Sequence, residues 1–252
     1  MLIQNLRLPT YLNTMRSIFL TAEWRKLAIV NYAVDPAMLK AYLPYKTELD
    51  FWKDNCYVSL VGFRFINTKL RGISIPFHTQ FEEINLRFYV KYKEGNAWKR
   101  GVTFIREIVP KPALTIVANS IYKEKYITLP TRHSWKIDPD EIHVSYEWKF
   151  KGVWDSLNVT SLATPTDILP GTEEEFITEH YWGYTPVSRI RTSQYQVEHP
   201  RWQTYSVKSH RVNVRFSELY GPAFGILNNA VPDSIMLAEG SSIKVRAANR
   251  IK

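Results

Sequence analysis

Lys111 stands between two prolines, directly after an apolar stretch from Val102 to Val109. The stretch is rich in Val, Phe and Ile and predicts a buried strand, and the residues after Pro112 have helical spacing. Lys111 is therefore expected near a helix N-terminus with apolar neighbours, a setting that disfavours an ammonium ion. A lysine that loses its proton near neutral pH is the nucleophile that Schiff-base chemistry requires. The alternative is a lysine that extends from a turn into solvent.

A run of polar side chains follows one face of the segment 81–92. In an extended strand, successive side chains point to opposite faces. Glu83, Asn85, Arg87 and Tyr89 therefore share one face, and apolar residues share the other. On an open sheet the polar face would contact water. In a small barrel it would line the interior, where these residues would be available to a ligand.

Arg106 and Glu107 lie in the strand expected over 102–109. Glu107 shares its side of that strand with Ile105. It is therefore either a buried carboxylate paired with an arginine or a residue of a pocket. Arg87 or Arg106 could receive a carboxylate ligand through the fork of donors on its guanidinium.

Several reaction classes are excluded by missing motifs. The chain lacks the glycine-rich nucleotide motifs, the HExxH helix, the GxSxG elbow and the EF-hand pattern. Its six histidines are dispersed, and no two are spaced to bind one metal from one element. We therefore expect no metal and no cofactor. The single cysteine, Cys56, is expected to be a buried structural thiol, and it favours a reducing compartment, hence the cytoplasm.

The elements that would position these residues are mainly strands. Alternation with period two dominates the chain, and about nine segments are rich in β-branched or aromatic residues. The expected strands are 27–33, 57–69, 81–92, 102–109, 126–129, 143–150, 187–197, 211–216 and 241–247. Three short helices are expected: one begins at Pro36 after the N-cap Asp35, one begins after the proline at 112, and one follows Thr172, where Glu175 completes a capping box.

One domain is expected over residues 21–252. Strands of similar spacing continue on both sides of the turn-rich segment 162–171, and no linker composition separates them. Residues 1–20 are expected to form an N-terminal extension, with Met15 as an alternative start. No apolar run resembles a signal peptide or reaches the ~20 residues that span a bilayer. We therefore expect no membrane partner.

The chain has 252 residues, with 33 Lys and Arg against 24 Asp and Glu, and a formal net charge of +9. Positive charge can neutralise phosphates, but here the basic residues are scattered along the whole chain. We therefore expect no nucleic acid partner. The 45% apolar content supports a globular core. The oligomeric state, a homo-oligomer included, stays open.

Three parts of the sequence resemble the YqjF-like family, also called domain of unknown function 2071. They are Trp24 with Leu43-Pro44, Glu83-Ile-Asn-Leu-Arg-Phe-Tyr-Val90, and Phe176-Ile-Thr-Glu-His-Tyr-Trp-Gly-Tyr-Thr185. The resemblance covers about Thr21 to Val245. The segment Arg106-Glu-Ile-Val-Pro-Lys-Pro-Ala-Leu114 is also similar to the Arg-Glu…Pro-Lys-Lys-Leu segment of acetoacetate decarboxylases, to whose superfamily the YqjF-like proteins are related.

The resemblance implies a mainly β fold with minor α: a curved sheet or β-barrel with a few peripheral helices and an internal cavity. It places Lys111 where the decarboxylases have their Schiff-base lysine and Glu83 where they have a strand glutamate, whereas Pro112 stands where they have a second lysine. It also implies a small organic acid or ketone as the ligand. The expected ligand-binding residues are Arg87, Asn85, Tyr89, Arg106 and Glu107.

Two functions are compatible with this resemblance. The first is a decarboxylase-like lyase, with Lys111 as the nucleophile and Glu83 adjusting proton transfers. The second is a non-catalytic protein that binds or senses a small molecule on the same fold. A polar cavity with Lys111 turned outward would favour the second.

Overall fold

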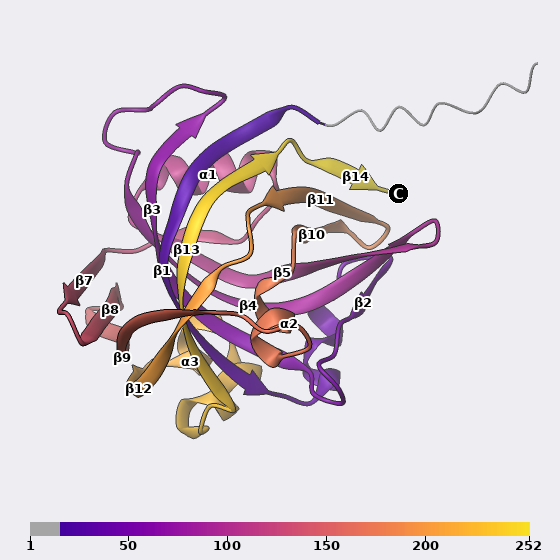
Figure 1. The fold of residues 1–252 in the computed structure, drawn as a ribbon. Helices are drawn as coiled ribbons and strands as arrows, with labels where there is room; N and C mark the ends of the chain where they lie inside the picture. The colour runs from indigo at the N-terminus through magenta and orange to yellow at the C-terminus, as the bar shows by residue number, and fades with distance from the viewer. Residues whose placement is uncertain (1–15) are drawn as a thin grey trace, which may run out of the picture.

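The computed structural model describes residues 16–252, which form one mixed, strongly curved sheet with short helices around it (Figure 1). Strands from both halves of the chain join this sheet. The mainly β fold predicted from the sequence is therefore confirmed. The first strand begins at Ile18, so the last residues of the expected N-terminal extension belong to the sheet, and residues 1–15 lie outside the described part.

Fourteen strands and five short helices make up the described part of the chain. The strands are β1 (Ile18–Ala33), β2 (Thr47–Leu49), β3 (Tyr57–Leu70), β4 (Phe81–Glu94), β5 (Ala97–Val109), β6 (Tyr126–Thr128), β7 (Thr131–Ile137), β8 (Glu141–Phe150), β9 (Val153–Asp167), β10 (Trp182–Ser188), β11 (Arg191–Glu198), β12 (Gln203–Asn213), β13 (Ser234–Arg246) and β14 (Asn249–Ile251). The helices are η1 (Pro36–Tyr42), α1 (Pro112–Ile121), α2 (Glu173–Thr178), α3 (Phe216–Tyr220) and η2 (Pro222–Asn229), where η marks a 3₁₀ helix.

Seven of the strands form a closed ring. β11, β10, β5, β4, β3, β1 and β13 are neighbours in that order, and β13 pairs again with β11. Only β5 and β10 run parallel within the ring. The β10–β11 hairpin joins β5 on one side and β13 on the other through two residue pairs each. It is therefore held in the wall of the ring by short ladders on both sides.

The remaining large strands cover the outside of the ring. β12, β9, β8 and β7 continue the sheet from β13, and an apolar cluster packs between them and β1, β3 and β4. Leu60 and Leu86 contribute from the ring, and Tyr146 and Trp148 contribute from β8. Gly62 permits this close approach, because a Cβ at this position would lie 2.8 Å from the ring of Tyr146.

A second apolar cluster faces the inside of the ring. Phe63 on β3, Phe81 on β4 and Val102 on β5 belong to it. Along β4, the odd-numbered residues face inward and the even-numbered residues belong to the outer cluster. The alternation that predicted this strand therefore places its polar face inside the ring.

The three helices expected from the sequence are present. Asp35 caps η1 by accepting a hydrogen bond from the Ala37 N–H at 2.8 Å, and α1 begins at Pro112. Thr172 caps α2 by accepting from the Glu175 N–H at 3.3 Å. The short helices α3 and η2 were not predicted, and their buried residues pack into the outer cluster.

Several segments differ from the strands expected, and β2, β7, β9 and β14 have no counterpart among them. The strand expected over 211–216 ends at Asn213, and Phe216 begins α3 with its side chain buried. The strand expected over 187–197 is a hairpin, since β10 ends at Ser188 and β11 begins at Arg191. β9 runs on through the turn-rich segment to Asp167, because β12 pairs with it there. Pairing with a distant strand outweighs local turn propensity in this segment.

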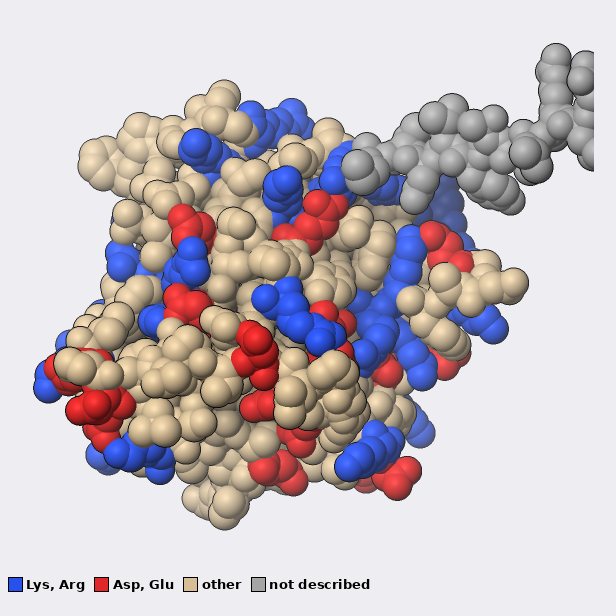
Figure 2. Space-filling model, in the orientation of Figure 1, with Lys and Arg blue, Asp and Glu red and all other residues tan. Residues whose placement is uncertain are grey.

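The surface carries both signs of charge. On the face drawn in Figure 2, Lys and Arg side chains lie among Asp and Glu side chains. Ion pairs such as Arg132–Glu147 and Lys208–Glu141 join charged side chains of the surface. Within residues 16–252, no helix combines the length and the apolar character needed to cross a membrane.

Candidate functional site

A cavity of about 230 Å³ lies within the ring. Apolar and aromatic side chains from the ring strands, from α1 and from the β3–β4 loop form most of its wall. The polar side chains with acid or base chemistry in this wall are Glu83, Arg87, Glu107, Glu124, His78, His180, His199, Tyr122, Tyr126 and Tyr195. A mostly apolar pocket with a few convergent polar groups is the usual form of a small-molecule site.

Four of the residues expected at the site line this cavity. Glu83, Asn85 and Arg87 alternate along β4, and Glu107 lies opposite Asn85 in the pairing of β4 with β5. All four side chains are buried. Since neighbours on one face of a strand are about 7 Å apart, they form a polar row along one side of the cavity.

Glu83 is held by two hydrogen bonds. The Tyr126 hydroxyl donates to its Oε2 at 2.8 Å, and Asn85 Nδ2 donates to its Oε1 at 3.0 Å. Burial raises the pKa of Glu83 to about 7, although these two hydrogen bonds oppose the change. The Glu83 carboxyl therefore gains or loses its proton near neutral pH.

Glu107 and Glu124 complete an acidic cluster with Glu83. Glu124 is buried and accepts a hydrogen bond from Thr185 Oγ1 at 2.6 Å. Burial raises the pKa of both glutamates, and the neighbouring Glu124 and Glu83 help to raise that of Glu107 well above its usual range. Burial therefore shifts all three carboxyls of the acidic cluster toward their protonated forms. Among residues 16–252, no group of three or more His, Cys, Asp or Glu side chains is arranged to hold a metal ion.

An irregularity in β5 lies at Ile105, immediately before Arg106, and decides which of Arg106 and Glu107 faces the cavity. The register with β4 shifts between Leu86 and Arg87, so β5 carries one additional residue there. Arg106 pairs with Leu86 and donates a hydrogen bond to the carbonyl of Leu219. It is not part of the cavity wall in the described residues, whereas Glu107 is.

Tyr89 and Lys111 also lie outside the set of described residues that form the wall. The Tyr89 hydroxyl is 2.7 Å from Ser59 Oγ, and its ring lies against the ring of His180, with centroids 4.7 Å apart. Lys111 is the partly buried N-cap residue of α1. The helix that Lys111 precedes does line the cavity, through Leu114 and its neighbours.

His180 adds a neutral imidazole to the wall. Its Nε2 lies 3.2 Å from Asp50 Oδ2, and Arg100 Nε donates to the same oxygen at 2.6 Å. Burial would raise the pKa of Asp50, but these hydrogen bonds outweigh it and lower the pKa to about 2. Since an ionised carboxylate only accepts hydrogen bonds, Nε2 of His180 carries the hydrogen. Burial lowers the pKa of His180 to about 4, and its Nδ1 has no hydrogen-bond partner in the described part of the chain.

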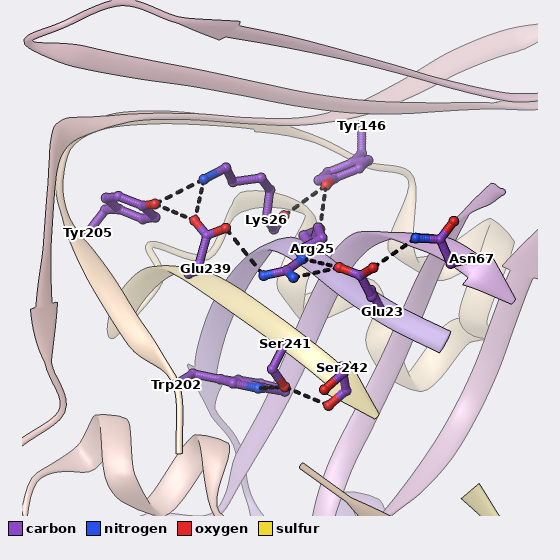
Figure 3. Close-up of polar contacts among 10 residues, drawn as sticks. All are labelled: Glu23, Arg25, Lys26, Asn67, Tyr146, Trp202, Tyr205, Glu239, Ser241 and Ser242. Carbon is purple, nitrogen blue, oxygen red and sulfur yellow. Dashed lines mark hydrogen bonds and ion pairs between the residues drawn. The ribbon is translucent and has the colours of Figure 1, made fainter. Parts of the chain in front are cut away.

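A separate polar network joins β1, β12 and β13 (Figure 3). Lys26 has a φ of 53° and lies where the register between β1 and β3 shifts. Its ammonium group donates to the Tyr205 hydroxyl at 2.9 Å and to Glu239. Arg25 connects Glu239 with Glu23. Because these charges pair with one another, we assign the network a structural role.

Residues 21–242 match the DUF2071 family, which is described as an uncharacterized conserved protein. The chain belongs to this family. The resemblance inferred from the sequence is therefore confirmed. A curated relative is the uncharacterized protein YqjF of Bacillus subtilis (strain 168), which is 31% identical over 91 residues. These residues are 36% of this chain and 36% of that protein, so the match spans about a third of the relative's length.

Solved structures with the same fold include acetoacetate decarboxylase, an acetoacetate decarboxylase-like enzyme and an enduracididine biosynthesis enzyme. Acetoacetate decarboxylase from Legionella pneumophila has a TM-score of 0.64 at 14% identity, covering 98% of this chain and 93% of its own. An acetoacetate decarboxylase-like enzyme from Sphingomonas wittichii RW1 has a TM-score of 0.62 at 10% identity, covering 99% of both chains. The enduracididine biosynthesis enzyme MppR, complexed with pyruvate, has a TM-score of 0.63 at 13% identity, covering 97% and 95%. At these identities the similarity shows the fold.

Seven acid or base side chains in the wall of this DUF2071 member were not among the candidates from its sequence. They are His78, Tyr122, Glu124, Tyr126, His180, Tyr195 and His199. Glu124 and Tyr126 reach the cavity because β6 runs parallel to β5 after α1, with Tyr126 opposite Glu107. A parallel pairing across a helix leaves no local pattern in the sequence. His180 lies inside one of the segments that carried the family resemblance, which was the available signal for it.

Proposed function

We propose that the chain binds a small organic acid or ketone in the cavity, with Arg87 receiving the carboxylate of an acid. One observation carries the proposal: Arg87 belongs to the cavity wall, and its Nε is buried without a hydrogen-bond partner in residues 16–252. A buried cation without a paired anion is costly. A ligand carboxylate that accepts the guanidinium N–H groups would supply the counter-charge and form a charge-assisted pair.

The size and chemistry of the cavity support this class of ligand. A volume of about 230 Å³ with mostly apolar walls suits a compact molecule with one or two polar groups. A neutral ketone would bind through its carbonyl oxygen, which accepts hydrogen bonds, and burial raises the pKa of Glu107 and so favours the protonated carboxyl that can donate one. The complex of MppR with pyruvate supports a small keto acid, because MppR shares the fold.

A Schiff-base lyase reaction is the second candidate. It is favoured by the position of Lys111 immediately before α1, whose Ala113 and Leu114 form part of the cavity wall. In this reaction the free amine of Lys111 would attack the ketone carbon of a 3-keto acid such as acetoacetate and expel water. The resulting iminium would accept the electron pair released when carbon dioxide leaves. The reaction requires the Lys111 side chain to reach into the cavity.

Calorimetry with pyruvate, acetoacetate and acetone tests the binding proposal. Arg87→Gln should weaken the binding of both acids by about ten- to a hundredfold and leave acetone unchanged, because only the acids carry a carboxylate. Arg106→Gln is the matched control, since it removes the same charge from the opposite side of the adjacent strand. Equal effects of the two substitutions, or no binding of any probe by the wild-type chain, would contradict the proposal.

Borohydride reduction separates the two candidates. If Lys111 forms a Schiff base, reduction in the presence of acetoacetate should add one ligand to the protein, and peptide mapping should locate it at Lys111. Lys111→Ala should then abolish the adduct. Binding of acetoacetate without a specific adduct would leave the non-catalytic binding function.

A further inference from the structure

Two buried acceptors in the cavity wall have no donor. Asn85 Oδ1 and Glu107 Oε2 accept no hydrogen bond from any residue in the range 16–252. Each residue is 1% exposed, and the two lie at paired positions of β4 and β5. A buried acceptor without a partner has lost its hydrogen bonds to water and has not replaced them. A ligand that donates hydrogen bonds at this end of the cavity would recover that loss.

We propose that Asn85, Glu107 and Glu124 form an ammonium-binding subsite, so that the ligand of the cavity is a small zwitterion carrying both an amine and a carboxylate. The inference rests on the proposed function for its carboxylate, which pairs with Arg87. An ammonium group has three N–H donors and no acceptor. It therefore fits a subsite made of one amide oxygen and two carboxyl groups, and no donor of the ligand is left without a partner.

The charge of the wall favours a cation at this end. Among the described residues that line the cavity, three carboxyl groups, those of Glu83, Glu107 and Glu124, stand against one arginine, Arg87, so a bound cation can be matched when one of these carboxyls ionises. Attraction between opposite charges is stronger in an apolar enclosure than in water. A purely anionic ligand would satisfy Arg87 but would meet the acidic cluster with its remaining surface. A zwitterion places its carboxylate at Arg87 and its ammonium group at the acidic cluster.

The spacing of the two ends sets the kind of ligand to test. Asn85 and Arg87 are separated by one residue on the same face of β4, and therefore by about 7 Å along the strand. 4-Aminobutyrate carries an ammonium group and a carboxylate on a chain of intermediate length. Butyrate keeps only the carboxylate, and butylamine keeps only the ammonium group. These three probes differ in charge but have nearly the same apolar surface.

Binding of an ammonium group should release a proton from the acidic cluster. Burial favours the protonated form of these carboxyls, and a cation beside them favours the ionised form. The hydroxyls of the surrounding tyrosines stay protonated, because burial raises their pKa well above the usual value. The titratable and charged groups around Glu107 are Glu83, Arg87, Glu124, Lys125, Tyr126 and Tyr195.

The test is calorimetry of the full chain with the three probes, in two buffers of different ionisation enthalpy. We expect 4-aminobutyrate to bind at least about tenfold more tightly than butyrate or butylamine, with proton release that butyrate does not show. Glu107→Gln should lower the affinity for 4-aminobutyrate to about that for butyrate. Unchanged binding of butyrate by this variant reports that its cavity is intact. Glu82→Gln is the matched control and should leave all three affinities unchanged, because Glu82 pairs with His133 on the opposite side of β4.

The outcomes separate this inference from the proposed function. If butyrate binds as tightly as 4-aminobutyrate, or if Glu107→Gln weakens both equally, the ammonium subsite is refuted and the acid-binding function stands. If butylamine binds as tightly as 4-aminobutyrate and butyrate does not bind, the subsite stands and the role of Arg87 is refuted. If no probe binds while pyruvate does, the zwitterion is refuted alone. If neither the probes nor pyruvate bind, both are refuted.

Discussion

The carboxyl group of Glu83 should make the protein less stable as the pH rises. Its pKa is about 7 in the folded chain against an ordinary 4.5. Between these values the folded state holds a proton that the unfolded state has released. The contribution of Glu83 to stability therefore falls as the pH rises from about 4.5 to about 7, and it stays low above that range. One unit of difference between the folded and unfolded pKa values corresponds to about 1.4 kcal/mol. The pKa difference of Glu83 therefore corresponds to roughly 3 kcal/mol of unfolding free energy.

Glu83→Gln should remove this loss. The introduced amide has the shape of the protonated carboxyl and can accept the hydrogen bond from Tyr126. Its NH₂ group can donate to Asn85, whose Oδ1 is free once that amide turns. We expect the variant to match the wild type to within about 1 kcal/mol near pH 5 and to be roughly 3 kcal/mol more stable near pH 8. Urea denaturation at both pH values measures the two unfolding free energies.

Glu82→Gln provides the control, because the pKa of Glu82 is shifted in the opposite direction to that of the adjacent Glu83. Burial would raise the pKa of Glu82, but hydrogen bonds from His133, at 2.5 Å, and from Thr131, at 2.6 Å, lower it to about 2. This variant should be less stable than the wild type at both pH values, since it loses a favourable pairing. If Glu83→Gln is also less stable than the wild type near pH 8, the reasoning about the buried carboxyl is refuted.

Three further predictions concern other parts of the molecule. Arg215 donates to the two oxygens of Asp155 at 2.9 and 3.1 Å. Arg215→Ala should leave the Asp155 carboxylate buried without its partner and lower the unfolding free energy, measured by urea denaturation, by about 3–5 kcal/mol. Adding Asp155→Asn should restore part of this free energy, and no restoration would contradict the ion pair as its origin. Gly183→Ala would place a Cβ 2.1 Å from the ring of Tyr195 and should cost about 1–3 kcal/mol, and an unchanged Tm would disprove that close approach. Burial raises the pKa of Cys56 to about 11, so a disulfide reagent near pH 8 should label it only after unfolding; rapid labelling of the native chain would show that the thiol is accessible.

The part of the site that could be predicted lies on one strand. The alternation along β4 predicted that Glu83, Asn85 and Arg87 share one face. The family resemblance predicted that this face lines the inside of a barrel. The structure has these residues in the cavity wall. Tyr89 continues the same face but lies beyond the cavity, against Ser59 and His180. Periodicity fixes the face of a strand, whereas the extent of a cavity depends on what packs across it.

The rest of the site depends on irregular and distant pairing. The additional residue in β5 decides that Glu107 and not Arg106 faces the cavity, and no feature of the sequence marks its place. Tyr195 reaches the acidic cluster because Gly183, on the paired strand, leaves room for its ring. The function of Lys111 stays a prediction. The helix start that motivated it is correct, but the direction of a lysine side chain is not encoded by the residues around it.

The short ladders at both edges of the β10–β11 hairpin have a consequence for the rate at which ligands enter and leave. Regions held by few backbone hydrogen bonds open with smaller free energies than the whole protein needs to unfold. This hairpin carries Trp182, Gly183, Tyr195 and Val197 of the cavity wall and joins β5 and β13 through two residue pairs each. The pairing of β1 with β13, by contrast, runs from Ile18 to Asn31. Transient detachment of the hairpin would therefore provide an exit route while the β1–β13 side of the ring stays closed, so that residence time is set by the wall as well as by the contacts of the bound molecule.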